Sequence, residues 1–236
     1  MRSHSGRRGA LLVLLSLVLR AVPAPGQGLP PVAEPAFCAP ETFLAHEIAG
    51  AGDAGIERLR AFRLGGVVLA GMAVGDSDAA AVARLAEGHG ATAADRYCTW
   101  YVNRGNREAE RLFRQIYLPN PSSLRADEAA QVYGELFGPA LTEGPDGLWQ
   151  CLDEKGFLAV GCNGQKHRGP TAFGMILAAL GCTPEHAAEI VNNLWGLNDV
   201  PVATRLAAIR RGYEIGARNP ELRARLQRLL ADPKQP

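Results

Sequence analysis

The chain has 236 residues, of which 47% are hydrophobic, with 25 basic and 24 acidic side chains and a formal net charge of +1. A chain of this length can bury a hydrophobic core of its own. The near balance of charges excludes the strongly basic class of nucleic-acid-binding proteins.

The N-terminus has the order of a cleavable signal peptide. Three arginines precede residues 9–19, an uncharged stretch rich in leucine and valine that ends at Arg20. A membrane-spanning helix needs about 20 apolar residues, so this stretch is too short to be a good anchor. We therefore predict a signal peptide over residues 1–24 and a periplasmic or secreted, soluble protein without a transmembrane span. Its removal leaves 21 basic and 24 acidic residues, so nucleic acid is not an expected partner.

The remainder divides into a proline-rich extended leader, residues 25–40, and a single domain, residues 41–236. In most of this domain apolar side chains recur at three- and four-residue spacing, which predicts amphipathic helices. The expected helical stripes are Ile56 to Phe62, Val82 with Leu85, Leu112 to Tyr117, Val132 to Phe137 and Phe173 to Leu180.

The last third has the clearest helix boundaries. Gly181 is a natural end for the helix that contains Phe173, and Thr183 and Pro184 are suited to the N-cap and first position of the next. Two more helices are expected over residues 202–213 and 220–230.

Two regions look less helical. The apolar run at residues 67–74 fits a buried strand or a loosely packed helix, and periodicity does not decide between them. Residues 148–152 and 157–160 flank a polar turn and suggest a short hairpin. The predicted fold class is therefore mainly α: a compact multi-helix domain with at most a small β-hairpin, stapled by disulfides.

Five cysteines remain after cleavage, namely Cys38, Cys98, Cys151, Cys162 and Cys182. An oxidising compartment favours their pairing, and the odd count leaves one unpaired or intermolecular. Cys162 and Cys182 are equally available partners for Cys151, so the connectivity stays open.

Familiar short motifs are incomplete in this chain. Gly50, Gly52 and Gly55 match a dinucleotide-binding pattern but follow a helical segment rather than a strand. Gly75-Asp76-Ser77 and Gly196-Leu197-Asn198-Asp199 resemble two sequence blocks of GDS-type esterases and lipases, but the Asp-x-x-His needed to activate the serine is absent. Asp76 and Ser77 fit a helix N-cap better. The histidines lack metal-ligand spacing, so no metal and no cofactor are expected.

The densest polar segment runs from Cys162 to Pro170. Lys166, His167 and Arg168 stand immediately before a predicted helix, whose exposed N–H groups attract anions. The alternative is a solvated basic loop that a disulfide at Cys162 holds in place.

A second polar segment, Tyr97 to Asn106, combines aromatic side chains with Arg104 and Asn106. Such a mixture can line a groove for a sugar or an aromatic ligand. The alternative is that the aromatic residues pack in the core while the polar residues form a turn.

These observations predict an exported, non-catalytic protein that binds an anionic small molecule or an envelope protein partner. The expected ligand-binding residues are Lys166, His167 and Arg168, with Arg104 and Asn106. The alternative hypothesis is an exported hydrolase of cell-wall or polysaccharide glycan with Asp or Glu as acid and base. Its candidate carboxylates are Glu108, Glu110, Glu128 and Glu135.

Overall fold

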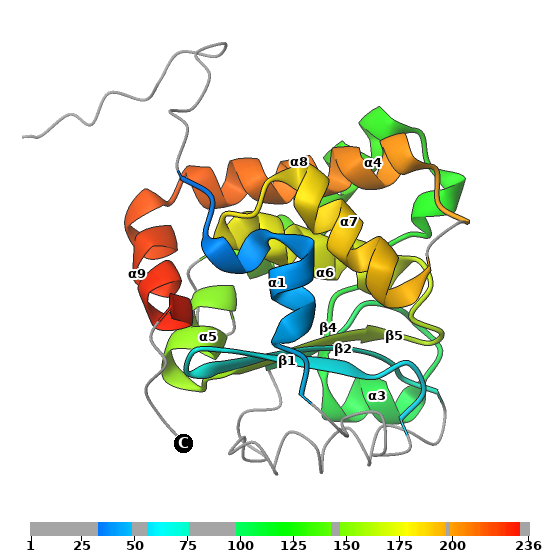
Figure 1. The fold of residues 1–236 in the computed structure, drawn as a ribbon. Coiled ribbons are helices and arrows are strands. Elements are labelled where there is room, and N and C mark those ends of the chain that lie inside the picture. Colours follow the sequence, from blue (N-terminus) through cyan, green and yellow to red (C-terminus); the bar gives the residue numbers. More distant parts are fainter. Residues whose placement is uncertain (1–32, 49–55, 76–97, 143–146, 197–198, 232–236) are drawn as a thin grey trace, which may run out of the picture. The chain divides into compact units, whose positions relative to one another are not determined.

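The fold contains a five-stranded sheet, and most of the described helices lie on one side of it (Figure 1). The computed structural model describes residues 33–48, 56–75, 98–142, 147–196 and 199–231. Internal contacts divide the chain into residues 1–31 and 32–236, and every described residue belongs to the second unit. The predicted signal peptide, the glycine motif at residues 50–55 and the Val82 stripe lie outside the described residues, as do Asp76 and Ser77.

The sheet has the strand order β1-β2-β5-β3-β4. β1 pairs antiparallel with β2, whereas β2, β5, β3 and β4 run parallel to one another. The strands are β1 (Arg60–Leu64), β2 (Val67–Ala73), β3 (Thr99–Tyr101), β4 (Arg114–Gln115) and β5 (Phe157–Cys162). Every residue of β2, β3 and β5 is buried, as expected for a parallel sheet covered on both faces.

The described helices connect and cover these strands. They are α1 (Pro40–Ala45), α3 (Arg107–Leu112), α4 (Ala126–Leu136), α5 (Leu148–Glu154), α6 (Arg168–Leu180), α7 (Pro184–Trp195), α8 (Val202–Ala217) and α9 (Pro220–Ala231), with short 3-10 turns at Ala36–Cys38, Pro121–Ser123 and Gly138–Leu141. None of them is both long and apolar enough to cross a membrane.

The mainly α prediction is wrong, because the protein has an α/β fold. The run at residues 67–74 contains the interior strand β2, whose side chains are buried on both faces and so show no alternation. The predicted hairpin does not form. Its first half is helix α5, and its second half is β5, which pairs in parallel with β2 and β3.

Two predicted helical stripes are also interrupted or replaced by strands. The stripe from Ile56 to Phe62 enters β1, and the stripe from Leu112 to Tyr117 contains the end of α3 followed by β4. Both segments are too short for the spacing of their apolar residues to distinguish a helix from a strand.

The helix predictions of the last third are confirmed. The Thr183 hydroxyl accepts a hydrogen bond from the His186 N–H and caps α7, and Gly181 ends α6 with a φ of 120°. α6 is buried from Gly169 to Leu180 and packs against both the sheet and α8. The approach to α8 is so close that a Cβ on Gly216 would lie 2.2 Å from the Ala179 carbonyl oxygen.

Two disulfides join distant parts of the domain. Cys38 pairs with Cys182, and Cys98 pairs with Cys151. The prediction that disulfides are present is confirmed, and they are compatible with an exported protein. Cys162 is the free cysteine, so the disulfide-anchored loop considered from the sequence does not exist.

Candidate functional site

The candidate site lies at the carboxyl edge of the parallel strands. Open α/β sheets bind ligands at this edge, because the loops that follow parallel strands gather there. Here the loops after β2, β5 and β3 are joined by hydrogen bonds. The Val74 N–H donates to the Cys162 carbonyl at 3.0 Å, and the Val102 N–H donates to the Gly161 carbonyl at 2.9 Å.

The centre of the site is the turn from β5 into α6. Cys162 is the last residue of β5 and Arg168 is the first of α6, with five residues between them. We refer to residues 162–168 as the Cys162 loop. At the start of α6 the main-chain donors are the Arg168 and Gly169 N–H groups, because Pro170 has no N–H and the Thr171 N–H donates to the His167 carbonyl at 3.2 Å. Donors at a helix N-terminus favour an oxyanion.

The Cys162 thiol is buried at the base of this loop. The Gly169 N–H, in the first turn of α6, donates to the Cys162 Sγ at 3.4 Å. The thiol itself donates to the Gln165 Oε1, with 3.9 Å between the sulfur and the oxygen. The loop therefore places the free cysteine beside main-chain donors and basic side chains.

Gln165 shapes the loop from within. It is fully buried and has a φ of 43°, a left-handed conformation that is uncommon outside glycine. Its Oε1 lies so close to α6 that a Cβ on Gly169 would be 2.0 Å away, so position 169 requires glycine. The amide is thus held in the interior, and the exposed side of the loop is left to Lys166, His167 and Arg168.

The Arg168 guanidinium is held by one of its nitrogens. Its Nε–H donates to the Leu118 carbonyl at 2.7 Å. Within the described residues its two terminal nitrogens have no hydrogen-bond or ion-pair partner. Fixing the plane of a guanidinium in this way prepares its terminal N–H groups for bidentate binding of an oxyanion.

Tyr133 of α4 provides an uncharged wall beside the loop. Burial raises the pKa of Tyr133 far above its ordinary value, the Arg168 charge lowers it and the nearby Cys162 raises it. The phenol therefore stays protonated, and its O–H donates to the Pro119 carbonyl at 2.9 Å.

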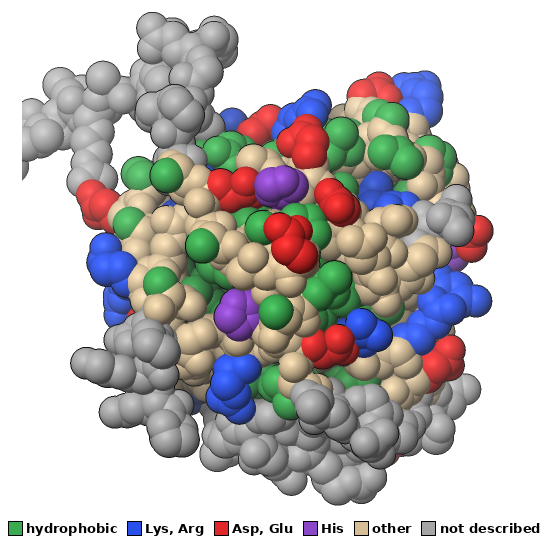
Figure 2. Space-filling model, viewed as in Figure 1, with side chains coloured by type: hydrophobic (Ala, Val, Ile, Leu, Met, Phe, Trp, Pro, Cys, Tyr) green, Lys and Arg blue, Asp and Glu red, His purple; other side chains and the backbone are tan. Residues whose placement is uncertain are grey.

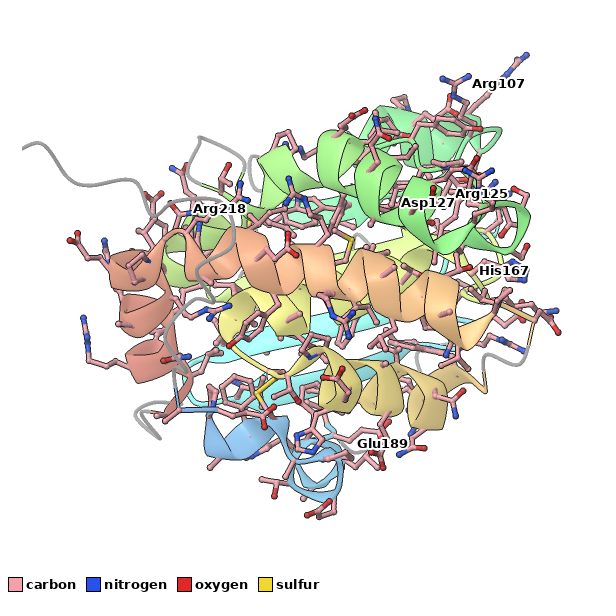
Figure 3. All side chains as sticks on the ribbon, turned by 90° about the horizontal axis from the view of Figure 1, so that it is seen from above. Arg107, Arg125, Asp127, His167, Glu189 and Arg218 are labelled. Carbon is pink, nitrogen blue, oxygen red and sulfur yellow. A yellow bond between two sulfur atoms is a disulfide. The ribbon has the colours of Figure 1, made fainter. Side chains whose placement is uncertain are left out.

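His167 is half-buried and lies at the end of the molecule toward which β5 runs (Figure 3). Burial lowers the pKa of His167 below its ordinary value, the carboxylate of Asp199 opposes this shift, and the Arg168 and Lys166 charges reinforce it. The Nε2 atom lies 3.8 Å from the Asp199 Oδ2. The imidazole is therefore mainly neutral at pH 7 in the free protein.

We expect an anion in the loop to raise the pKa of His167, because a negative charge favours the imidazolium. Sulfate affinity should accordingly increase as the pH falls from 8 to 6, a range in which sulfate itself does not titrate. NMR titration of the histidine rings with and without sulfate measures both pKa values. His186, which pairs with Glu34 at 3.0 Å elsewhere in the fold, is the internal control, and equal behaviour of the two rings would contradict the expectation.

Arg104 and Asn106 follow β3 and lie at the same edge as the Cys162 loop. Asn106 is buried, its amide N–H groups donate to the carbonyls of Val74 and Gly75, and its Oδ1 accepts from the Ala109 N–H. It therefore anchors the loop between β3 and α3. Arg104 is exposed and covers the Tyr117 ring, with its Cζ 3.8 Å from the ring centroid.

The four glutamates of the hydrolase alternative do not converge on a cleft. Glu108 pairs with Arg111, Glu110 accepts the Gly105 N–H, Glu128 accepts the Arg125 N–H and Glu135 accepts from the Gln131 amide. None of the four is buried. Their contacts are those of helix caps and solvated helix faces.

One group in the described part of the chain has the donor atoms for a metal, namely Glu34, Cys38 and Cys182. Its two sulfur atoms are bonded to each other, so they are not available as thiolate ligands.

Sequence reasoning did not identify Cys162 as a free, buried cysteine at the base of this loop. The available signal was its position six residues before Arg168, at the start of a predicted helix. The five cysteines do not reveal from sequence which of them is unpaired.

No family model matches the chain, and no curated protein or solved structure is significantly similar to it.

Proposed function

We propose that the protein is exported and binds the phosphate group of a phosphate ester in the Cys162 loop, where the Cys162 thiolate attacks the phosphorus atom. The observation that carries this proposal is the geometry around one sulfur atom. A free, buried thiol accepts the Gly169 N–H, and the same turn carries Arg168, whose two terminal nitrogens have no partner within the described part of the chain. Phosphate fits such a donor set because it offers several strong acceptor oxygens at once.

The reaction proceeds in two balanced steps. In the first, an Sγ–P bond forms and the P–O bond to the alcohol breaks, and the departing oxygen takes a proton from water. In the second, water attacks the phosphorus atom, the Sγ–P bond breaks, and phosphate and the thiolate are released. The Arg168 guanidinium and the main-chain N–H groups of Arg168 and Gly169 stabilise the charge on the phosphoryl oxygens in both steps.

A second candidate is the binding of a phosphorylated ligand without cleavage, on a small molecule or on an envelope protein. It is favoured by the distribution of carboxylates. Among the described residues, Asp199 is the carboxylate that approaches the loop, and it pairs with His167. No described carboxylate contacts Cys162 or Arg168. The departing oxygen therefore has no positioned acid in the described part of the chain.

Arg168→Ala tests phosphate binding, which both candidates require. We expect inorganic phosphate to bind about 10- to 100-fold more weakly, since charge-assisted hydrogen bonds contribute about 1.5–3 kcal/mol. Isothermal titration measures the affinity, and hydrolysis of p-nitrophenyl phosphate reports cleavage.

Arg218→Ala is the matched control, because this exposed arginine lies at the opposite end of the molecule from His167 (Figure 3). It removes the same charge and should leave affinity unchanged. Thermal unfolding of both variants checks that loss of the bond from Arg168 to Leu118 does not unfold the protein. An Arg168→Ala variant that is folded and binds phosphate normally would refute the proposal.

A further inference from the structure

A second cation stands beside the Cys162 loop with no acidic partner among the described residues. The Arg104 guanidinium lies over the exposed ring of Tyr117, with the Cζ atom 3.8 Å from the ring centroid. A cation held on an aromatic face keeps its N–H groups available in the plane of the guanidinium. In the face drawn in Figure 2, basic and acidic side chains are mixed at the edge toward which β5 runs.

The loop that carries Arg104 is fixed at several points. Gly105 has a φ of 96°, and its N–H donates to the Glu110 Oε1 at 2.9 Å. Asn106 binds the Gly75 carbonyl at 2.8 Å. Glu110 thus uses a carboxylate oxygen on the backbone, and no carboxylate among the described residues pairs with Arg104.

The Arg104 pair is connected directly to the first anion site. Tyr117 immediately precedes Leu118, whose carbonyl receives the Arg168 Nε–H. The short segment after β4 therefore contacts two guanidinium groups. The ring of Tyr117 contacts Arg104, and the carbonyl of Leu118 accepts a hydrogen bond from Arg168. The Tyr101 O–H, on the neighbouring strand β3, also binds the Asn163 side chain of the Cys162 loop.

We propose that Arg104 and Tyr117 form a second anion subsite, so that the preferred ligand is a small phosphate ester with a further phosphate or carboxylate group. This inference rests on the proposed function, because the first phosphate occupies the Cys162 loop. The second anion pairs with the Arg104 guanidinium, and the carbon skeleton between the two groups contacts the exposed part of the Tyr117 ring.

Matched ligand pairs test the second subsite. Comparing fructose 1,6-bisphosphate with fructose 6-phosphate measures the effect of an added phosphate on binding. Comparing 3-phosphoglycerate with glycerol 3-phosphate measures the effect of an added carboxylate. The readout is the ratio of dissociation constants within each pair, measured by titration at fixed ionic strength. We expect the wild type to favour at least one dianionic member by about ten-fold, in line with one additional charge-assisted contact.

Arg104→Ala should reduce this ratio at least five-fold, and Arg104→Lys should retain part of it, because the charge remains while the planar fork is lost. Arg218→Ala should keep the full ratio. A wild-type ratio near one for both ligand pairs, or an unchanged ratio in Arg104→Ala, overturns the second subsite. Binding of the monophosphates still supports the phosphate site in the Cys162 loop. Absence of binding by every ligand overturns both proposals.

Discussion

Cys162→Ser should lower the rate of p-nitrophenyl phosphate hydrolysis at least about 1,000-fold while the protein still binds inorganic phosphate. A serine hydroxyl is almost fully protonated at neutral pH, and no general base contacts position 162 among the described residues. The N–H groups of α6 and the Arg168 guanidinium are unchanged in this variant, so the anion site persists. Steady-state kinetics and isothermal titration measure the two effects separately.

Phosphate should also protect Cys162 from alkylation by iodoacetate, with mass spectrometry as the readout. The disulfide-bonded cysteines are the internal control, because they do not react in the folded, oxidised protein. Hydrolysis that survives in Cys162→Ser would show that the thiol is not the nucleophile. Loss of phosphate binding together with hydrolysis would show that Cys162 acts only in holding the loop.

The double variant Cys38→Ser/Cys182→Ser should lower the free energy of unfolding by about 5 kcal/mol, the loop-entropy value for a sequence separation of 144 residues. This corresponds to a decrease in Tm of roughly 10–20 °C for a domain of this size. The loss is expected because the bond ties the first described segment to the end of α6. Glu34 in that segment also accepts the Thr183 N–H at 2.6 Å.

The variant Cys98→Ser/Cys151→Ser is the comparison for this stability prediction. Its bond spans 53 residues, for which the same relation gives about 4 kcal/mol. Thermal and guanidinium unfolding of both variants give the two values. A loss of less than about 1 kcal/mol for the Cys38 and Cys182 pair would mean that the remaining contacts hold the N-terminal segment without the covalent bond.

Local chemistry made the C-terminal helices predictable. Thr183 and Pro184 identify the start of α7 because an N-cap side chain and a proline act within one helical turn. The sheet could not be predicted in the same way. β2 is buried on both faces and loses the alternation of a half-exposed strand, and β4 has two residues, too few to show any period.

Part of the candidate site could also be predicted from local sequence. Lys166, His167 and Arg168 could be placed at a helix start, since that inference uses neighbouring residues only. The contact between β3 and this loop, in which the Tyr101 O–H binds the Asn163 side chain, depends on β3 lying next to β5 in the sheet, and strand order is a long-range property. The free state of Cys162 likewise depends on which cysteines the fold brings within bonding distance.

The two disulfides are nested: the bond between residues 38 and 182 encloses the one between residues 98 and 151. A chain that crosses a membrane N-terminus first exposes Cys38 and Cys98 to oxidation long before Cys182 emerges. Pairing in order of emergence would join these two and leave Cys151 with Cys162, which would consume the proposed nucleophile. If the protein is exported as proposed, a Cys38–Cys98 bond formed in this way must be broken by thiol–disulfide exchange before the two native bonds can form.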